Sequence, residues 1–160
     1  MQMAGDGLQA EAFGLLAREP EGYHPVLMTR KLRVIALVAA AAGPAGMVGG
    51  QAIDLAAAGS QGKTASSVAP LDAAGLQGMH LRKTGALIRA SVVAGAVMAG
   101  ADERLTAAVD QFGQEIGLAF QIVDDVLDLV GDPDRAGKSL GTDLIQEKPT
   151  LPLIHLLATS

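Results

Sequence analysis

The sequence predicts an all-α protein, and two features of the chain support this fold class. No segment shows the alternation of apolar and polar residues that indicates a half-buried β-strand. Alanine and glycine supply much of the 49% hydrophobic content, whereas aromatic residues make up only 2%. Small side chains of this kind allow helices to pack closely. With 160 residues, the chain is expected to form one domain, residues 1–160.

The first part of the chain has helical segments that end at proline or glycine. Residues 8–16 predict a helix that stops before Pro20. Residues 26–42 are strongly helical and end at Gly43-Pro44, which breaks the pattern. Residues 46–58 predict a further short helix that begins among glycines.

The second part begins with the most loop-like stretch of the chain, residues 59–69. Residues 71–100 predict one long helix, or two helices joined near Lys83-Thr84. A further helix is expected over residues 102–130, where a glycine, an aspartate and a proline follow it. The last apolar helix is predicted at residues 151–157.

Charge and composition exclude several classes of function. The net charge is −5 and aromatic residues are scarce, so the basic face and stacking side chains of a nucleic-acid-binding protein are missing. Cysteine is absent, which excludes disulfides and agrees with a cytoplasmic location. The first six residues do not resemble a signal peptide. The apolar stretches at 34–48 and 86–101 are interrupted or short, so no membrane span is expected.

Residues 121–129 read QIVDDVLDL and place three aspartates among five apolar residues. On a helix, Gln121, Asp124, Asp125 and Asp128 fall on one stripe, and apolar residues occupy the other faces. We expect those other faces to be surrounded by protein. Carboxylates three and four residues apart repel one another, and no lysine or arginine in the stripe relieves that repulsion.

Two interpretations of this aspartate stripe remain open from spacing alone. In the first, the acids form a solvated outer face of the helix. In the second, they bind a hard divalent cation through oxygen, as Mg²⁺ does when it keeps several waters and also accepts phosphate oxygens. The exclusive use of the short aspartate side chain and the apolar flanks favour the metal site.

The segment F-Q-x-x-D-D-x-x-D at residues 120–128 resembles the second aspartate-rich motif of the trans-isoprenyl diphosphate synthases. Within this family, the sequence is most similar to farnesyl and geranylgeranyl diphosphate synthases. Further matching segments follow the family order and extend over nearly the whole chain: Ala4-Gly5-Asp6, residues 46–55, residues 80–88, Gly137-Lys138, and Gly141-Thr142-Asp143 with residues 148–152. The resemblance implies an isoprenoid synthase-type helical bundle.

The resemblance also implies a reaction, the condensation of an allylic diphosphate with isopentenyl diphosphate. Asp124, Asp125 and Asp128 match the motif that ligates Mg²⁺ in the family. Diphosphate leaves poorly until metal ions and cationic side chains neutralise the charge that it gains. The pocket must also exclude water, which would otherwise quench the allylic cation.

Five further residues match positions near the leaving diphosphate in the family. Lys83, Thr84 and Gln121 are the catalytic candidates, and all three are expected to bind the diphosphate. Lys138 and Lys148 match two further diphosphate-binding lysines.

Five other polar residues are assigned a supporting or a structural role. Gln51 and Asp54 lie on one helical face at a spacing of three, and we assign them a supporting role. His80 is interpreted as structural, as are His24 and His155.

Part of the family pattern has no counterpart in the chain. Family members carry an earlier aspartate-rich motif and an arginine pair before the segment that resembles Ala4-Gly5-Asp6, and no second D-D-x-x-D occurs here. We therefore expect a partial bundle that lacks the N-terminal helices bearing the first motif. We also expect the chain alone to be weakly active or inactive.

The sequence leaves two alternatives to prenyl transfer. The first is a non-catalytic helical dimerisation partner or pseudoenzyme, in which residues 26–42 pair with a second copy or a full-length synthase; a homodimer is expected in either case. The second is nucleotide binding, because residues 57–64 fit a relaxed phosphate-loop pattern. That motif needs a preceding buried strand, and residues 51–55 are too polar and alanine-rich to form one.

Overall fold

The computed structural model describes residues 2–59 and 71–130, and the elements within these ranges are all helical. The all-α prediction is confirmed. The elements are α1 (Gln2–Arg18), α2 (Pro25–Ala42), α3 (Met47–Gly59), α4 (Ala73–His80), the π-helical turn η1 (Leu81–Gly85), α5 (Ala86–Ala99) and α6 (Glu103–Val130).

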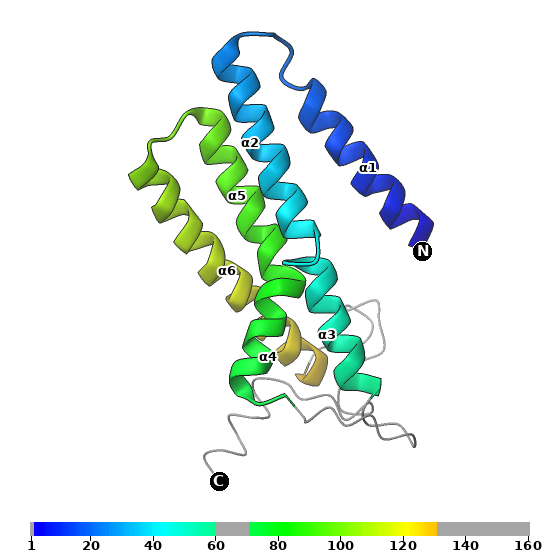
Figure 1. Cartoon of the computed structure of the whole chain (residues 1–160). Coiled ribbons are helices and arrows are strands. Elements are labelled where there is room, and N and C mark those ends of the chain that lie inside the picture. The colour runs from blue at the N-terminus through cyan, green and yellow to red at the C-terminus, as the bar shows by residue number, and fades with distance from the viewer. Residues whose placement is uncertain (1, 60–70, 131–160) are drawn as a thin grey trace.

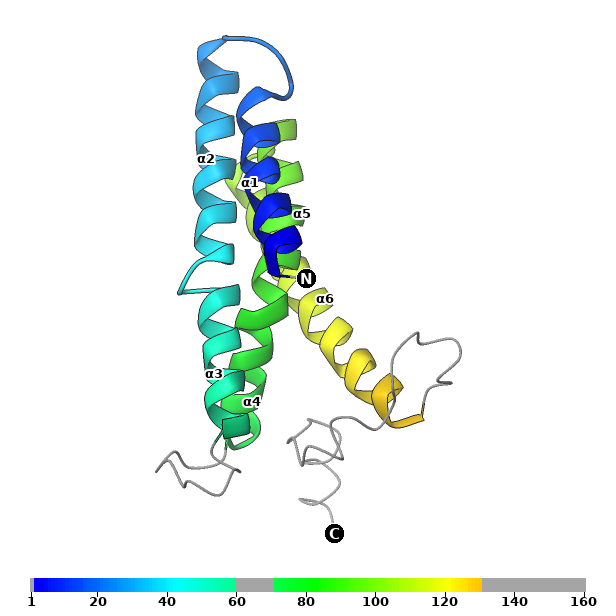
Figure 2. The ribbon, with the colours of Figure 1, turned by 90° about the vertical axis from the view of Figure 1, so that its right-hand side faces the viewer.

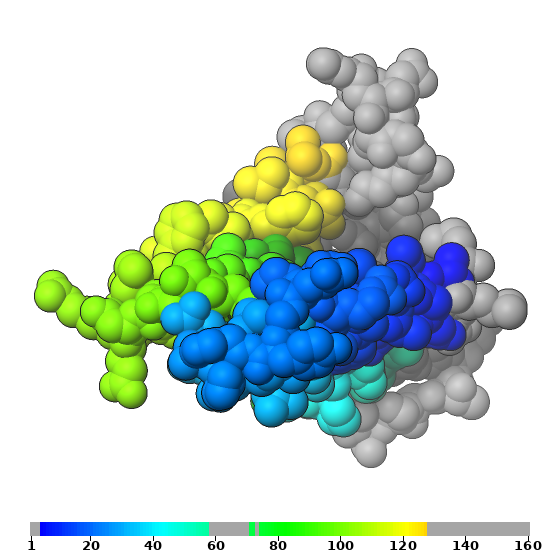
Figure 3. All heavy atoms as spheres, turned by 90° about the horizontal axis from the view of Figure 1, so that it is seen from above, coloured from blue at the N-terminus to red at the C-terminus, as the bar shows by residue number. Residues whose placement is uncertain are grey.

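The helices form a bundle that contains two helical hairpins, and α3 extends one of them (Figure 1). α1 and α2 form the first hairpin, and α3 continues along the same side of the bundle after a short turn. α5 and α6 form the second hairpin, and α5 lies between α2 and α6. α6 diverges from the other helices toward its C-terminal end (Figure 2). Seen from above, α1 and α2 and the yellow part of α6 occupy different sides of this bundle (Figure 3).

Local chemistry sets the ends of the helices. Asp72 caps α4, where its Oδ1 accepts a hydrogen bond from the N–H of Gly75 at 2.7 Å. Asp102 caps α6 in the same way, and its Oδ1 accepts from the N–H of Leu105 at 2.7 Å. α5 ends at Gly100, whose φ of 83° is the left-handed conformation that glycine adopts without a Cβ penalty.

The apolar core lies where α2 and α5 cross. Val34 of α2 and Val93 and Val97 of α5 form the buried centre. Partly buried side chains from α1, α2, α5 and α6 surround it, among them Leu16, Leu37 and Val109. This core holds α1, α2, α5 and α6 together. The elements α3, α4 and η1 contribute no described residue to it and are held by other contacts.

Two basic residues of α2 stabilise the ends of neighbouring helices. The buried Lys31 ammonium donates to the carbonyls of Ala17 and Arg18 at the C-terminus of α1, at 3.1 and 2.9 Å. Arg30 donates to the carbonyl of Met98 near the end of α5 at 3.1 Å. The last carbonyls of a helix lack intrahelical partners and carry partial negative charge, so cations bind there favourably.

Glycines bring α3 and α6 unusually close to η1. A Cβ added at Gly50 of α3 would lie 2.3 Å from the backbone nitrogen of Lys83. A Cβ added at Gly117 of α6 would lie 2.7 Å from the Cα of Gly85. Real Cβ atoms do not approach backbone this closely, so each contact requires glycine. The η1 turn is therefore enclosed by backbone on two sides.

The structure confirms the expected helical segments within the described ranges. Residues 71–100 contain two helices joined at Lys83-Thr84, the second of the two predicted arrangements, and the join is the π-turn η1. Residues 51–55 are helical, as part of α3, so no strand precedes the relaxed phosphate-loop pattern. The expected loop at 59–69 and the helix at 151–157 lie largely or wholly outside the described residues.

One stretch of the described residues, Pro25–Ala57, is long and apolar enough to cross a membrane by length and composition alone. Core helices of soluble proteins pass the same test. The stretch is interrupted between α2 and α3, where Gly46 N–H donates to the carbonyl of Gly43. It also contains the buried Lys31, whose charge is satisfied by carbonyls of the protein itself.

We predict that Gly50→Ala lowers the free energy of unfolding by about 1–3 kcal/mol, because the new methyl group must displace the backbone of Lys83. Gly95→Ala is the matched control, since nothing lies within 4 Å of a Cβ at that position in α5. It should be neutral or stabilising by about 0.5–1 kcal/mol. Chemical denaturation of both variants measures the difference, and equal effects would contradict the close approach at η1.

Candidate active site

The π-turn η1 places two consecutive polar side chains against two different helices. η1 is a single π-helical segment between α4 and α5, and such turns are frequently found at functional sites. Lys83 contacts Asp54 on α3, and Thr84 contacts Gln121 on α6. The lysine-threonine pair predicted to bind diphosphate thus lies at the junction of three helical elements.

Lys83 and Asp54 form a partly buried ion pair. The Lys83 Nζ donates to Asp54 Oδ2 at 2.5 Å. The Asp54 side chain is mostly buried, whereas one third of the Lys83 side chain is exposed. An ammonium has three donors, so Lys83 can keep this contact and still donate toward an anion at the surface. Asp54, assigned a supporting role from the sequence, fixes the direction of the lysine.

A chain of hydrogen bonds connects η1 to the aspartate stripe. Thr84 Oγ1 donates to Gln121 Oε1 at 3.2 Å, and Gln121 Nε2 donates to Asp125 Oδ1 at 3.1 Å. The predicted residues Thr84, Gln121 and Asp125 are therefore brought together in space. The Gln121 amide accepts from Thr84 of η1 through its oxygen and donates to the Asp125 carboxylate through its nitrogen. It therefore sets the position of the carboxylate relative to η1.

The aspartates of the stripe differ in their surroundings. Asp125 is only 3% exposed, whereas Asp124 is exposed at the surface of α6. Asp128 lies in the last turns of α6, but its side chain is outside the described part. Lys138 and Lys148 also lie outside it. Among the side chains that are described, no group of three histidine, aspartate or glutamate residues is placed to hold a metal ion.

His80 belongs to this cluster, although sequence reasoning interpreted it as structural. Its Nε2 lies 3.9 Å from Asp125 Oδ2, and the residue is 7% exposed. Burial lowers the pKa of His80 below its usual value, because this effect outweighs the opposing influence of Asp125 and Gln121. One feature of the sequence points to a place for His80 in the site. His80 lies three residues before Lys83, and this spacing places both residues on one helical face.

The expectation that protein surrounds the apolar faces of this helix segment is wrong for the described structure. Large apolar residues of α6 are exposed, including Phe120 at 57%, Val123 at 55% and Leu127 at 52%. α6 instead approaches α5 and η1 most closely at Gly113 and Gly117, where an added Cβ would lie within 3.0 Å of Arg89 Cα or Gly85 Cα. The aspartate stripe thus lies beside an uncovered apolar surface.

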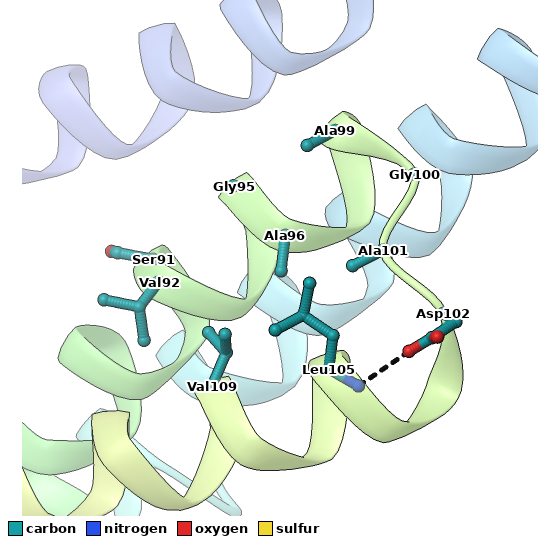
Figure 4. Close-up of a pocket in the computed structure, with 10 residues that line it drawn as sticks. All are labelled: Ser91, Val92, Gly95, Ala96, Ala99, Gly100, Ala101, Asp102, Leu105 and Val109. Atoms are coloured by element: carbon teal, nitrogen blue, oxygen red, sulfur yellow. Dashed lines mark hydrogen bonds between the residues drawn. The ribbon is translucent and has the colours of Figure 1, made fainter.

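A shallow depression occurs at the other end of the α5–α6 hairpin (Figure 4). Its Asp102 carboxylate is already bonded to the N–H of Leu105 as a helix cap. The remaining lining is small or apolar apart from one serine: Ser91, Val92, Gly95, Ala96, Ala99, Gly100, Ala101 and Val109. It offers no cation for a phosphate, so the polar junction at η1 is the better candidate site.

Comparison with known proteins identifies the family of this chain. The sequence model described as Polyprenyl synthetase matches residues 2–160. The chain belongs to the polyprenyl synthetase family. The family resemblance seen in the motifs is therefore confirmed.

The relatives of this polyprenyl synthetase chain include prenyl diphosphate synthases. It is 42% identical to the farnesyl diphosphate synthase of Geobacillus stearothermophilus, covering 98% of this chain and 49% of that protein. It is 41% identical to the geranylgeranyl diphosphate synthase of Cyanophora paradoxa, covering 94% and 46%. The chain thus spans about half the length of the relatives it matches.

A solved structure confirms the isoprenyl synthase type of helical fold. The geranyltransferase from Helicobacter pylori, complexed with magnesium and isoprenyl diphosphate, superposes with a TM-score of 0.76 at 29% identity. The match covers 98% of this chain and 49% of that structure. A partial bundle agrees with this coverage. The residue roles assigned above remain predictions.

We predict a favourable coupling of about 1 kcal/mol between Lys83 and Asp54, the value of a partly exposed charged hydrogen bond. The measurement is a double-mutant cycle on the free energy of unfolding with Lys83→Met, Asp54→Asn and the double variant. The coupling should fall as salt concentration rises, because the lysine is partly in contact with solvent. Additive effects of the two substitutions would contradict the ion pair.

Proposed function

We propose that the chain supplies the diphosphate- and metal-binding part of a prenyltransferase site. The reaction is the condensation of an allylic diphosphate with isopentenyl diphosphate. The single observation that carries the proposal is the junction at η1, where Lys83, Thr84 and Gln121 connect to the aspartate stripe. The names of the relatives support the same substrates.

Each residue of the junction has a proposed task. Lys83 donates to the leaving diphosphate from a position fixed by Asp54. The Thr84 hydroxyl donates its single hydrogen to Gln121 and so positions the Gln121 amide, whose second N–H is proposed to donate at the same place. Such prepositioned donors stabilise charge as it develops. Lys138 and Lys148 are proposed to add two further cations.

The aspartate stripe is proposed to hold Mg²⁺ through Asp124, Asp125 and Asp128. Carboxylate oxygen is the donor that Mg²⁺ prefers, and this ion commonly uses one or two carboxylates together with water and phosphate oxygens. The exposed Asp124 fits such a donor set, and the buried Oδ2 of Asp125 has no hydrogen-bond partner. A carboxylate oxygen has two lone pairs, so this Oδ2 can ligate a metal ion and still accept one hydrogen bond. When bound, Mg²⁺ would neutralise the charge gained by the departing diphosphate.

The surroundings of the site support weak or absent activity of the chain alone. The apolar face of α6 beside the aspartates is open to solvent, and water would quench an allylic cation formed there. A non-catalytic role as a helical dimerisation partner remains the second candidate, favoured by the same exposed apolar surface. We further propose a cytoplasmic homodimer without a membrane span or nucleic-acid partner.

We predict that Asp124→Asn weakens Mn²⁺ binding about tenfold or more, equivalent to about 1.4 kcal/mol. Mn²⁺ substitutes for Mg²⁺ at oxygen sites, and electron paramagnetic resonance measures its free concentration in the presence of inorganic pyrophosphate. Glu115→Gln removes a carboxylate from an exposed position on the same helix and should leave the affinity unchanged. Equal affinities in all three proteins would remove the metal assignment.

We expect the purified 160-residue chain to turn over an allylic diphosphate and isopentenyl diphosphate weakly, even with Mg²⁺ present. Incorporation of labelled isopentenyl diphosphate into longer products measures this activity. Robust turnover would refute the proposed incompleteness of the site. A chain that neither turns over nor binds Mn²⁺ and pyrophosphate would instead favour the non-catalytic partner.

A further inference from the structure

His80 and Asp125 face each other inside the protein with unsatisfied polar atoms. Both ring nitrogens of His80 and the Oδ2 of Asp125 are buried without a hydrogen-bond partner. The Nε2 and the Oδ2 are 3.9 Å apart, about 1 Å beyond a normal hydrogen bond. Leaving such groups unpaired in the interior is costly, so this arrangement requires an explanation.

The rest of the Asp125 carboxylate is already fixed. Its Oδ1 accepts from Gln121, which in turn accepts from Thr84. The Oδ2 lies beside a buried side chain that can supply a further donor, the imidazole of His80. A rotation that brings the Nε2 within hydrogen-bond distance would satisfy the Nε2 and the Oδ2 together.

The chemistry of the two groups suits this contact. A neutral imidazole has one N–H donor and one acceptor. Asp125 can only accept while it is ionised. The ring must therefore carry its proton on Nε2 for the pair to form.

The position of His80 in the chain connects this contact to the diphosphate-binding residues. It is the residue that immediately precedes η1. The buried ring thus fixes the start of the segment that presents Lys83 and Thr84, while Asp125 fixes the adjoining turn of α6 that presents Asp124.

We propose that His80 is a positioning residue, whose Nε2–H donates to Asp125 Oδ2 and holds the aspartate stripe in register with η1. This inference rests on the proposed function for its metal-binding consequence. The hydrogen bond itself is a property of the chain and can be tested separately. An apolar residue of similar size would fill the same space without performing this task.

The first experiment measures the tautomer of His80 in the wild-type chain by long-range proton–nitrogen correlation in nuclear magnetic resonance. At a pH where the ring is neutral, we expect a single form protonated at Nε2, and we expect Asp125→Leu to abolish that preference. The exposed His24 serves as an internal reference. A ring protonated at Nδ1, or one that averages between forms in the wild type, would overturn the proposal.

The second experiment measures Mn²⁺ affinity with pyrophosphate for three variants whose fold is checked by circular dichroism. His80→Phe should bind about 10–100-fold more weakly, the usual effect of removing an outer partner of a metal ligand. His80→Gln keeps a donor near Nε2 and should restore most of the affinity, and His24→Gln should bind as the wild type does. Glutamine that fails to improve on phenylalanine would reduce His80 to a packing role.

The two experiments separate failure of this inference from failure of the proposed function. If the wild-type chain binds no Mn²⁺, the metal proposal fails, and the tautomer of His80 still decides whether the hydrogen bond exists. If His80→Phe does not fold, the tautomer measurement on the wild-type chain and the His80→Gln variant remain decisive.

Discussion

The close approach of three backbones at η1 is the constraint on which the site depends. Gly50 allows α3 to reach Lys83, and Gly117 of α6 meets Gly85 directly. Without these contacts, Asp54 could not direct the Lys83 ammonium, and Gln121 could not bond Thr84. A hydrogen bond weakens steeply beyond its normal distance, so displacement of a helix by one methyl group is enough to disconnect the network. The abundance of glycine thus serves the arrangement of polar side chains.

α6 reverses the usual relation between burial and polarity. Among its described side chains, the buried positions are Thr106, Gly113, Gly117 and Asp125, whereas several large apolar residues face solvent. A carboxylate is costly to bury unless it is hydrogen-bonded, and Asp125 meets that condition on one oxygen through Gln121. Exposed apolar residues recur along α6 from Leu105 to Leu127, and the relatives of the chain are about twice as long. In the described part, the polar side of α6 thus contacts the bundle through Gln121 and Asp125, whereas its apolar side is uncovered.

The sequence predicted the helices well because glycine, proline and capping residues act locally. It also placed Gln121 and the aspartates on one stripe, since helical periodicity fixes which residues share a face. It did not predict the π-turn or the burial of His80, because both depend on which helices pack around residues 80–85. Helical periodicity also separated the polar face of α6 from its apolar face. It did not predict which of the two faces the bundle covers. Arg30 and Lys31 show the same limit, since a basic pair in sequence became two helix caps in the structure.

We propose that η1 and the aspartate stripe form one metal–diphosphate site. Paramagnetic broadening by Mn²⁺, recorded on the labelled chain with inorganic pyrophosphate, tests this most directly. We expect the amide signals of Lys83, Thr84 and Asp124 to disappear together, while those of α1 and the first half of α2 persist. Broadening confined to α6, or spread evenly over the chain, would contradict a single site at this junction.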